Sequence, residues 1–251
     1  MIKKALFVAA MIGLLVFQVM AQGNGNRGQE MGRGGQREYV RGRGTGSGGR
    51  FNGGMNALVS SLPHEELNEA EIKGLLQMRE EEKLARDVYL TLYQDWNHRI
   101  FQNINRSEQR HMEAVKALLD KYNLIDPVID DTIGVFSDST IQNLYYELVQ
   151  RGRISLIQAL FVGALIEDLD IFDLKEFIQV ADNVDIKTVY QNLMKGSRNH
   201  LRAFVSQLAA YNEIYEGTYL AQEEIEEIVD SPMERGLYNH EGNPLYPEIG
   251  W

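Results

Sequence analysis

Four long segments of the chain repeat their apolar residues at steps of three and four, which is the spacing of one buried face on an α-helix. They run from about residue 65 to 96, 100 to 122, 155 to 180 and 185 to 212. A shorter segment with the same spacing covers residues 138 to 150. The sequence therefore predicts an all-α fold dominated by four long helices, the first of which would span roughly 40 Å at 1.5 Å per residue.

The lengths of the connections predict how these helices are arranged. Only residues 97 to 99 separate the first two, so they should be antiparallel neighbours. The second and third are joined by a long irregular stretch, residues 124 to 136, and by the shorter helix, which Ser137 or Asp138 would cap. Such a crossover would leave the third helix parallel to the second. We therefore predict a four-helix bundle with a long crossover that carries an extra short helix.

Local signals set the expected helix boundaries. Pro63 fits a start of the first helix near Glu65. The third helix is expected to start near Ser155, and Asp185 is expected to cap the fourth.

Each of the four long faces is interrupted near its middle by residues that can bind a metal ion. In chain order they are Glu82, Glu108, His111, Glu167, Asp170 and His200. Glu108 and His111 are three residues apart, so both lie on one helix face and can reach a single point. Glu167 and Asp170 have the same spacing. Carboxylates and imidazoles together suit iron, manganese or zinc.

A metal-free interpretation gives these side chains other partners. Arg86, one turn from Glu82, is a candidate for a salt bridge with it, and the histidines would be ordinary core residues in a buried hydrogen-bond network. Glu80 and Glu81 are assigned to the solvent-exposed face. Together, however, the six candidates would place more acid than base in the interior, where an unpaired carboxylate is costly. A pair of divalent ions would neutralise them, so we favour a metal site.

The N-terminus has the pattern of a secretory signal peptide over residues 1–21. Two lysines precede an apolar run from Ala5 to Phe17, and Val19-Met20-Ala21 offers small residues at a cleavage site. The run is short for a membrane span, and an uncleaved anchor is the alternative. The chain has no cysteine, which excludes a lipoprotein anchored through a lipobox cysteine, disulfides, thiolate metal sites and a cysteine nucleophile. These features predict a protein exported to the periplasm or the extracellular space.

Residues 22–56 are rich in glycine and arginine, with 13 of the 23 glycines of the chain. They carry six arginines against two glutamates and little apolar surface, so we predict a disordered linker. Its positive charge could attract an anionic surface, and a plain linker is the alternative. Residues 57–251 carry 17 basic and 34 acidic side chains, which disfavours nucleic-acid binding by the helical part, residues 57–212. Residues 213–251 are predicted to be an acidic tail with one short helix around Glu223–Glu227.

Four stretches of the sequence carry a family resemblance. Glu82–Tyr89 is similar to the Glu-x-x-Ala-Arg-x-x-Tyr signature of rubrerythrins, and Ser107–Ala114 resembles their Glu-x-x-His helix. Ala164–Asp170 resembles the third ligand helix of these proteins, and Ser197–His200 the fourth. Over about residues 60–212 the chain therefore resembles the ferritin-like superfamily and, more closely, the uncharacterised family DUF2202.

This resemblance implies a di-iron or related site, in which two helices give one carboxylate each and two give Glu-x-x-His. Glu82 and Glu167 would be terminal carboxylates and Glu108 a bridge between the ions. His111 and His200 would each bind one ion. The expected cofactor is two iron ions, with manganese or zinc as alternatives.

The fourth helix departs from this pattern, because Ser197 stands where it should supply a glutamate. Asp170, one turn after Glu167, could replace it as a mobile or second carboxylate and complete six ligands. Asp168 is the weaker alternative. If neither does so, one metal position is weak and the site holds one ion or fills only transiently.

For function, the resemblance implies chemistry with oxygen or peroxide, such as ferroxidase or peroxidase activity, and assigns no catalytic residue. Without cysteine there is no rubredoxin-type domain, so such an enzyme would need an external electron donor. Tyr89 would hydrogen-bond a ligand or pack in the core, and Gly196 would let a neighbour come close. A non-catalytic metal-binding protein or an envelope-tethered interaction protein is the alternative. The linker and tail argue against a ferritin-type cage, whereas a homodimer is compatible with the sequence.

Overall fold

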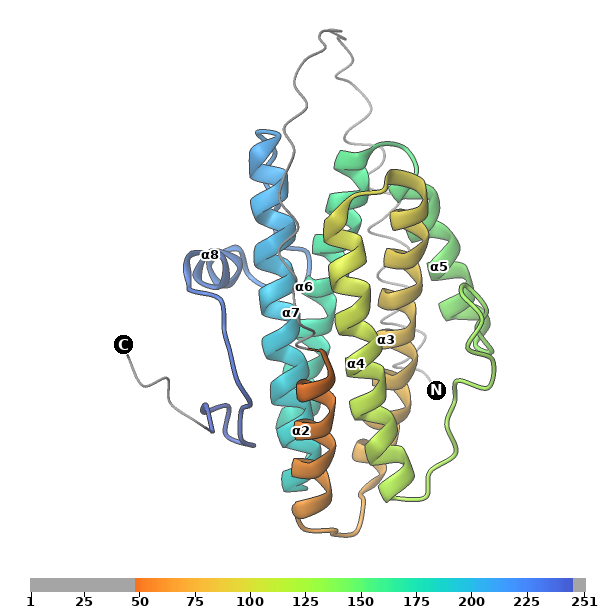
Figure 1. The fold of residues 1–251 in the computed structure, drawn as a ribbon, viewed down its shortest axis with the longest axis vertical. Helices are drawn as coiled ribbons and strands as arrows, with labels where there is room; N and C mark the ends of the chain where they lie inside the picture. The colour runs from red at the N-terminus through yellow and green to blue at the C-terminus, as the bar shows by residue number, and fades with distance from the viewer. Residues whose placement is uncertain (1–47, 246–251) are drawn as a thin grey trace, which may run out of the picture.

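The computed structural model describes residues 48–245, with side chains from residue 54, and this part of the chain is all-helical (Figure 1). Four long helices lie side by side, namely α3 (Glu69–Trp96), α4 (Arg99–Lys121), α6 (Leu156–Val180) and α7 (Val184–Ala210). Three shorter ones flank them, namely α2 (Gly48–Ser61), α5 (Ser139–Gly152) and α8 (Gln222–Asp230). The all-α prediction is confirmed. The predicted signal peptide, and the predicted linker up to residue 47, lie outside the described residues.

The long helices form two antiparallel pairs, α3 with α4 and α6 with α7 (Figure 1). Asn97 caps the end of α3, and its left-handed φ of 48° turns the chain into the antiparallel α4. The crossover then runs back along the length of the long helices to α5, so that α6 runs in the same direction as α4 (Figure 1). α7 returns antiparallel to α6. The path predicted from the connection lengths is therefore observed.

A capping box fixes the start of α3. Asn68 Oδ1 accepts from Glu71 N at 2.9 Å, and Glu71 Oε2 accepts from Asn68 N at 3.0 Å. The predicted start near Glu65 is thus four residues early, because these two reciprocal bonds outweigh the signal from Pro63.

Side-chain oxygens also mark the later helix starts. Asp138 and Ser155 cap α5 and α6, at the positions where the sequence predicted helix starts. Asp185 does not cap α7, which begins one residue earlier. Its carboxylate lies in the first turn and accepts from Lys121 Nζ at 2.7 Å and from Tyr122 Oη at 2.8 Å. Asp185 therefore joins the start of α7 to the end of α4.

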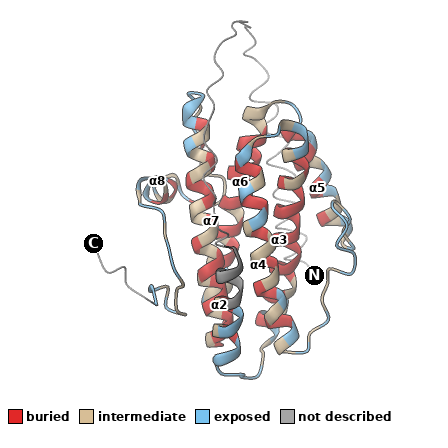
Figure 2. Cartoon of the chain, in the orientation of Figure 1, coloured by how far each residue is buried: buried red, intermediate tan, exposed pale blue. Residues whose placement is uncertain are grey.

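The interior contains two apolar clusters with a polar layer between them. One cluster includes Tyr89, Phe101 and Phe204, and the other includes Met78 and Leu118. All five side chains are fully buried, and removing such a side chain from water contributes about 1.5–3 kcal/mol. The buried residues of Figure 2 follow these inner faces. The candidate metal ligands come from the helix turns between the two clusters and form the polar layer.

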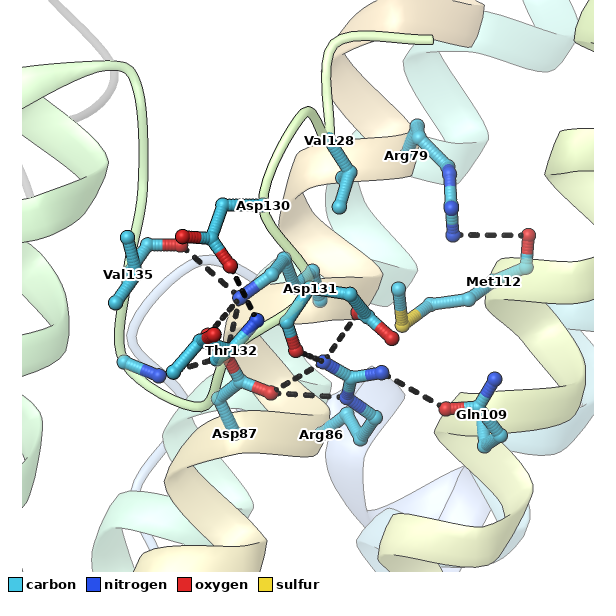
Figure 3. A network of polar contacts seen from close by, with 12 residues as sticks. Arg79, Arg86, Asp87, Gln109, Met112, Val128, Asp130, Asp131, Thr132 and Val135 are labelled. Carbon is cyan, nitrogen blue, oxygen red and sulfur yellow. Dashed lines mark hydrogen bonds and ion pairs between the residues drawn. The ribbon is translucent and has the colours of Figure 1, made fainter.

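A buried ionic network fastens the crossover to α3 (Figure 3). Asp87 is fully buried and accepts from Lys83 Nζ, Arg86 Nε and the backbone N–H of Gly134. Lys83 Nζ also donates to the carbonyl of Thr132 at 3.0 Å. Each buried charge therefore has a partner, as charges in an interior require.

The flanking segments pack on the long helices as well. α2 begins inside the stretch predicted as linker and buries Met55 and Val59 on the side of α4 and α7. After α7 the chain is held by Asp168, which accepts from Tyr215 Oη at 2.8 Å and from three backbone N–H groups. The short acidic helix predicted in the tail is α8. Within residues 48–245, no helix combines the length and apolar character that crossing a membrane would need.

Candidate metal centre

Two groups of buried acidic and histidine side chains meet in the polar layer. The first consists of Glu82 from α3 with Glu108 and His111 from α4. The second consists of Glu108, Glu167 from α6 and His200 from α7. Within each group, one ligand-type atom per residue lies within 4.8 Å of the others, so either group could hold a metal ion. Because Glu108 belongs to both, the two groups form one site.

Glu108 directs its two carboxylate oxygens at different histidines. Oε2 lies 2.7 Å from His111 Nδ1, and Oε1 lies 2.8 Å from His200 Nδ1. Neither oxygen has a hydrogen-bond partner with acceptable angles among the described residues. Two ligand atoms bound at right angles to one ion, each at about 2.1 Å, would lie about 3.0 Å apart. Short but misaligned contacts of this kind fit pairs of ligands that share an ion.

Glu82 and Glu167 complete the two groups on either side. Glu82 Oε2 is 3.2 Å from His111 Nδ1, and Glu167 Oε2 is 3.3 Å from His200 Nδ1. The two imidazole rings are stacked, with centroids 5.7 Å apart. The site is thus nearly symmetric about Glu108, since each half has a histidine, a carboxylate of its own and one oxygen of Glu108.

Burial and close charges shift the acid–base balance of the site. Burial outweighs the attraction of His111 and raises the pKa of Glu82 to about 7. Burial disfavours the charged form of His111, but Glu82 and Glu108 outweigh it and raise the pKa of this imidazole to about 9. Burial likewise opposes ionisation of Glu108, yet the two histidines hold its pKa well below the usual carboxyl range. Without a metal ion, the site therefore carries protons at neutral pH.

Tyr89 fixes the orientation of Glu167. Its hydroxyl is fully buried and donates to Glu167 Oε1 at 2.6 Å, with Gly163 O at 3.3 Å. This bond occupies Oε1, and the other carboxylate oxygen, Oε2, faces His200. Of the two roles considered for Tyr89, core packing and hydrogen bonding at the site, the structure shows both.

Gly196 and Ser197 lie on the turn of α7 before His200. A Cβ at Gly196 would lie 2.5 Å from His111 Nε2, so the glycine makes room for the histidine of the facing helix, as predicted. Ser197 is buried, and its hydroxyl donates back to Leu193 O at 3.3 Å. α7 therefore contributes a histidine and no carboxylate.

Asp170, the sixth predicted ligand, is buried beside the two groups and belongs to neither. Burial and the charges of Glu167 and Glu82 raise its pKa well above the usual carboxyl value. Its Oδ2 has no hydrogen-bond partner among the described residues. The structure thus brings five of the six predicted ligands together and leaves Asp170 next to them. Asp168, the weaker alternative, holds the C-terminal segment instead.

The pairing of Arg86 with Glu82, a candidate under the metal-free interpretation, is not present among the described residues. The guanidinium contacts Asp87 at 2.8 Å and Asp131 at 2.7 Å (Figure 3). Arg86 also donates to Gln109 Oε1 at 2.8 Å. Asp131 belongs to the crossover. The apolar spacing along a helix does not predict contacts with residues of a distant loop.

The assignment of Glu80 and Glu81 to a solvent-exposed face is wrong, since they are 7% and 9% exposed. From Gln77 to Tyr89, every residue of α3 is buried. The crossover also lies along this part of α3, since Asp126 accepts from Arg79 and Thr132 O accepts from Lys83, so α3 is covered on more sides than by α4 and α6 alone.

A cavity of about 440 Å³ beside the two histidines was not identified from the sequence. It lies between α4 and α7, and residues 234–237 form part of its wall. Its basic and imidazole lining residues are Arg110, His111, Lys195, His200 and Arg235. No local pattern places the segment after α8 against α7, so only the packed chain reveals this cavity.

Comparison with known proteins relates the whole site to a family. A family model described as "Uncharacterized protein domain (DUF2202)" matches residues 71–232, which include all six candidate ligands. The chain belongs to the DUF2202 family. This DUF2202 chain is similar to "Uncharacterized protein MJ0754" of Methanocaldococcus jannaschii, with 58% identity over 183 residues. The matched region covers 73% of this chain and 99% of the relative. A crystal structure of hypothetical protein MJ0754 from Methanococcus jannaschii DSM 2661 matches with a TM-score of 0.68 at 58% identity, covering 69% of this chain and 99% of that one.

Proposed function

We propose that this DUF2202 protein is an exported metalloprotein with a ferritin-like four-helix bundle and a dinuclear iron or manganese site. Glu82, Glu108 and His111 would hold one ion. Glu108, Glu167 and His200 would hold the other. Nitrogen and oxygen donors in this mixture suit iron, manganese and zinc.

The sharing of Glu108 between two equivalent groups is the observation that carries the proposal. A mononuclear site needs one point of convergence, whereas here ligand atoms converge on both sides of one carboxylate. Several buried oxygens lack a hydrogen-bond partner within the described residues, namely Glu82 Oε1, both oxygens of Glu108 and Asp170 Oδ2. An unsatisfied buried polar group costs about 1–3 kcal/mol, and more when it is charged. Two bound cations would remove most of this cost.

A bound pair of iron ions would supply redox chemistry toward oxygen or peroxide, so ferroxidase or peroxidase activity is the class we propose. The chain's own residues would bind and orient. Tyr89 holds Glu167 in place, and the full burial of Glu108 and Glu167 keeps water from the inner side of the site. His200 is 8% exposed and lines the cavity, so access would be from that side. Electrons would come from an external donor.

Anaerobic titration of the metal-free protein with Fe(II), followed by oxygen, tests the proposal. We expect about two irons per chain, as in carboxylate-bridged helical bundles, and an absorbance increase when oxygen is added. Glu108→Gln should abolish binding of both ions. Glu113→Gln, on the same helix and outside both groups, should bind as the wild type does. Absence of binding by any transition metal would leave a metal-free network and overturn the proposal.

A non-catalytic metal-binding protein, or an envelope-tethered interaction protein, is the second candidate. Ser197 favours it, because α7 gives no carboxylate and Glu108 is the only carboxylate shared by the two groups. Tight zinc binding without oxygen consumption after Fe(II) addition would identify a binder. Oxygen consumption that depends on Glu108 would identify an enzyme.

We propose that residues 1–21 direct export and are then removed. The basic linker that follows would be attracted to an anionic surface. Mass spectrometry of the protein recovered outside the cytoplasm should find Gln22 at its N-terminus. A mature chain that retains Met1 would contradict cleavage.

A further inference from the structure

The cavity beside the histidines has a charge opposite to that of the rest of the folded chain. Residues 57–251 carry 34 acidic and 17 basic side chains. The cavity is lined by three basic residues, Arg110, Lys195 and Arg235, and one acidic residue, Glu234. Glu234 is already engaged by two arginines of α7 that are not part of the lining. The lining therefore has more basic than acidic side chains.

The inner wall of the cavity is the edge of the proposed metal site. Both histidines turn Nδ1 toward the carboxylates, and their hydrogen bonds within the described residues run through that nitrogen. His111 Nε2 lies beside Gly196, and both residues line the cavity. A histidine that binds metal through one nitrogen usually donates its other N–H to a carboxylate, a carbonyl or water. A ligand with acceptor oxygens could take this role here.

The outer wall is the 234–238 segment, which lies along α7. Asn199 donates to Glu234 O and accepts from Glu234 N, both at 2.9 Å. Two turns earlier, Asn192 makes the same pair of bonds with the backbone of Tyr238, at 2.8 and 2.9 Å. Between them Lys195 Nζ donates to the segment's backbone. Three polar residues on one face of α7 therefore hold this wall by its main chain.

The cavity is larger than oxygen or peroxide requires. Its volume of about 440 Å³ falls in the range of about 300–1,000 Å³ that small-molecule sites occupy. Guanidinium groups bind carboxylates and phosphates through two parallel hydrogen bonds, and an ammonium group adds a point charge. Ser107 adds a neutral polar group to the lining. The size and the donors together suit an organic anion.

We propose that this cavity binds a small organic anion, with a carboxylate or phosphate group, next to the metal-binding histidines. Arg110 and Arg235 would pair with the oxyanion, and Lys195 would meet it from the α7 wall. Burial lowers the pKa of Lys195 to about 8, and a bound anion would favour its charged form. This inference deepens the proposed function. A role of the anion as substrate or second ligand rests on the proposed metal site, whereas binding of the anion itself needs no metal.

Anion binding to the metal-free full chain tests this proposal. Calorimetric titration with inorganic phosphate and with citrate, at constant ionic strength, should show saturable binding of one anion per chain. Arg110→Gln/Arg235→Gln should weaken it by about tenfold or more, because paired charge-assisted hydrogen bonds are lost. Arg106→Gln/Lys187→Gln removes the same charge from α4 and α7 outside the cavity and should bind as the wild type does. The probe that binds more tightly identifies the preferred oxyanion.

Equal weakening in the two double variants would mean non-specific attraction and would overturn the proposal, as would the absence of saturable binding. Both variants should fold, because Arg235 and Arg106 are exposed and Arg110 and Lys187 are only partly buried. The two proposals fail separately. A chain that binds phosphate or citrate but no Fe(II) refutes the metal site alone, and a chain that binds Fe(II) but neither anion refutes the anion site alone.

Discussion

Glu108 is fully buried, yet its oxygens face two histidine nitrogens rather than a lysine or an arginine. Such a carboxylate can be neutralised in two ways, by protons on the histidines or by cations between the ligands. The raised pKa of His111 corresponds to neutralisation by protons. The convergence of the two groups of ligands permits neutralisation by cations. Protons and metal ions should therefore compete for the same atoms.

The metal-free protein should lose stability as the pH rises, and a bound metal should reverse this. The folded-state pKa values of His111, about 9, and Glu82, about 7, lie above their ordinary values of 6.5 and 4.5. The folded state thus holds these protons more tightly than the unfolded state. That stabilisation is complete below the ordinary values, and it is lost as the pH rises to about 7 for Glu82 and to about 9 for His111. We expect a loss of roughly 4 kcal/mol between about pH 6 and pH 9.

Urea unfolding of the metal-free chain at the two pH values measures this loss. Competition with a coloured chelator should show metal affinity rising over the same interval, because binding must displace the protons. An affinity that does not change with pH would contradict a protonated metal-free site.

Tyr89→Phe should weaken metal binding without unfolding the protein. The substitution removes the 2.6 Å donor to Glu167 and keeps the ring packed against Phe101 and Phe204. Partners that orient metal ligands contribute about 10–100-fold to affinity, and we expect a loss in that range. Tyr190→Phe is the matched control, since this buried hydroxyl has no partner among the described residues. Equal losses in both variants would contradict a positioning role for Tyr89.

At the scale of helices and loops, the fold depends on what fastens the crossover to α3. Asp87→Asn would leave Lys83 and Arg86 buried without their shared counter-charge. Breaking a buried ion pair in this way costs about 3–5 kcal/mol, so we expect a destabilisation near the lower value, measured by urea unfolding. Asp120→Asn, which removes an exposed partner of Lys116, should change stability by less than about 1 kcal/mol. A small effect at Asp87 would mean that the crossover is held by its apolar contacts.

Helices and their inner faces could be predicted from the sequence because both depend on local spacing. Glu108 and His111, for example, share a face on any helix, and their meeting with Glu82 follows from a short turn between neighbours. Partners that come from far along the chain could not be predicted. Asp131, for example, forms an ion pair with Arg86. This contact depends on where the crossover packs on α3, which no local periodicity encodes.

At the scale of the whole molecule, the described chain combines an excess of acidic side chains, a buried acidic site and a cavity with basic lining residues next to that site. The 234–238 segment shows why sequence alone missed the cavity. Asn192 and Asn199 look like ordinary polar residues of a helix, and only the folded tail shows that they bind a backbone. A long-range contact between a helix and an irregular segment leaves no repeat in the sequence.

The dinuclear site is tested most directly by anomalous diffraction at the iron edge from crystals grown anaerobically with Fe(II). We expect two peaks on opposite sides of Glu108, about 2 Å from their ligand atoms. One peak should be bound by Glu82 and His111, and the other by Glu167 and His200. A single peak, or none at these residues, would contradict the dinuclear account.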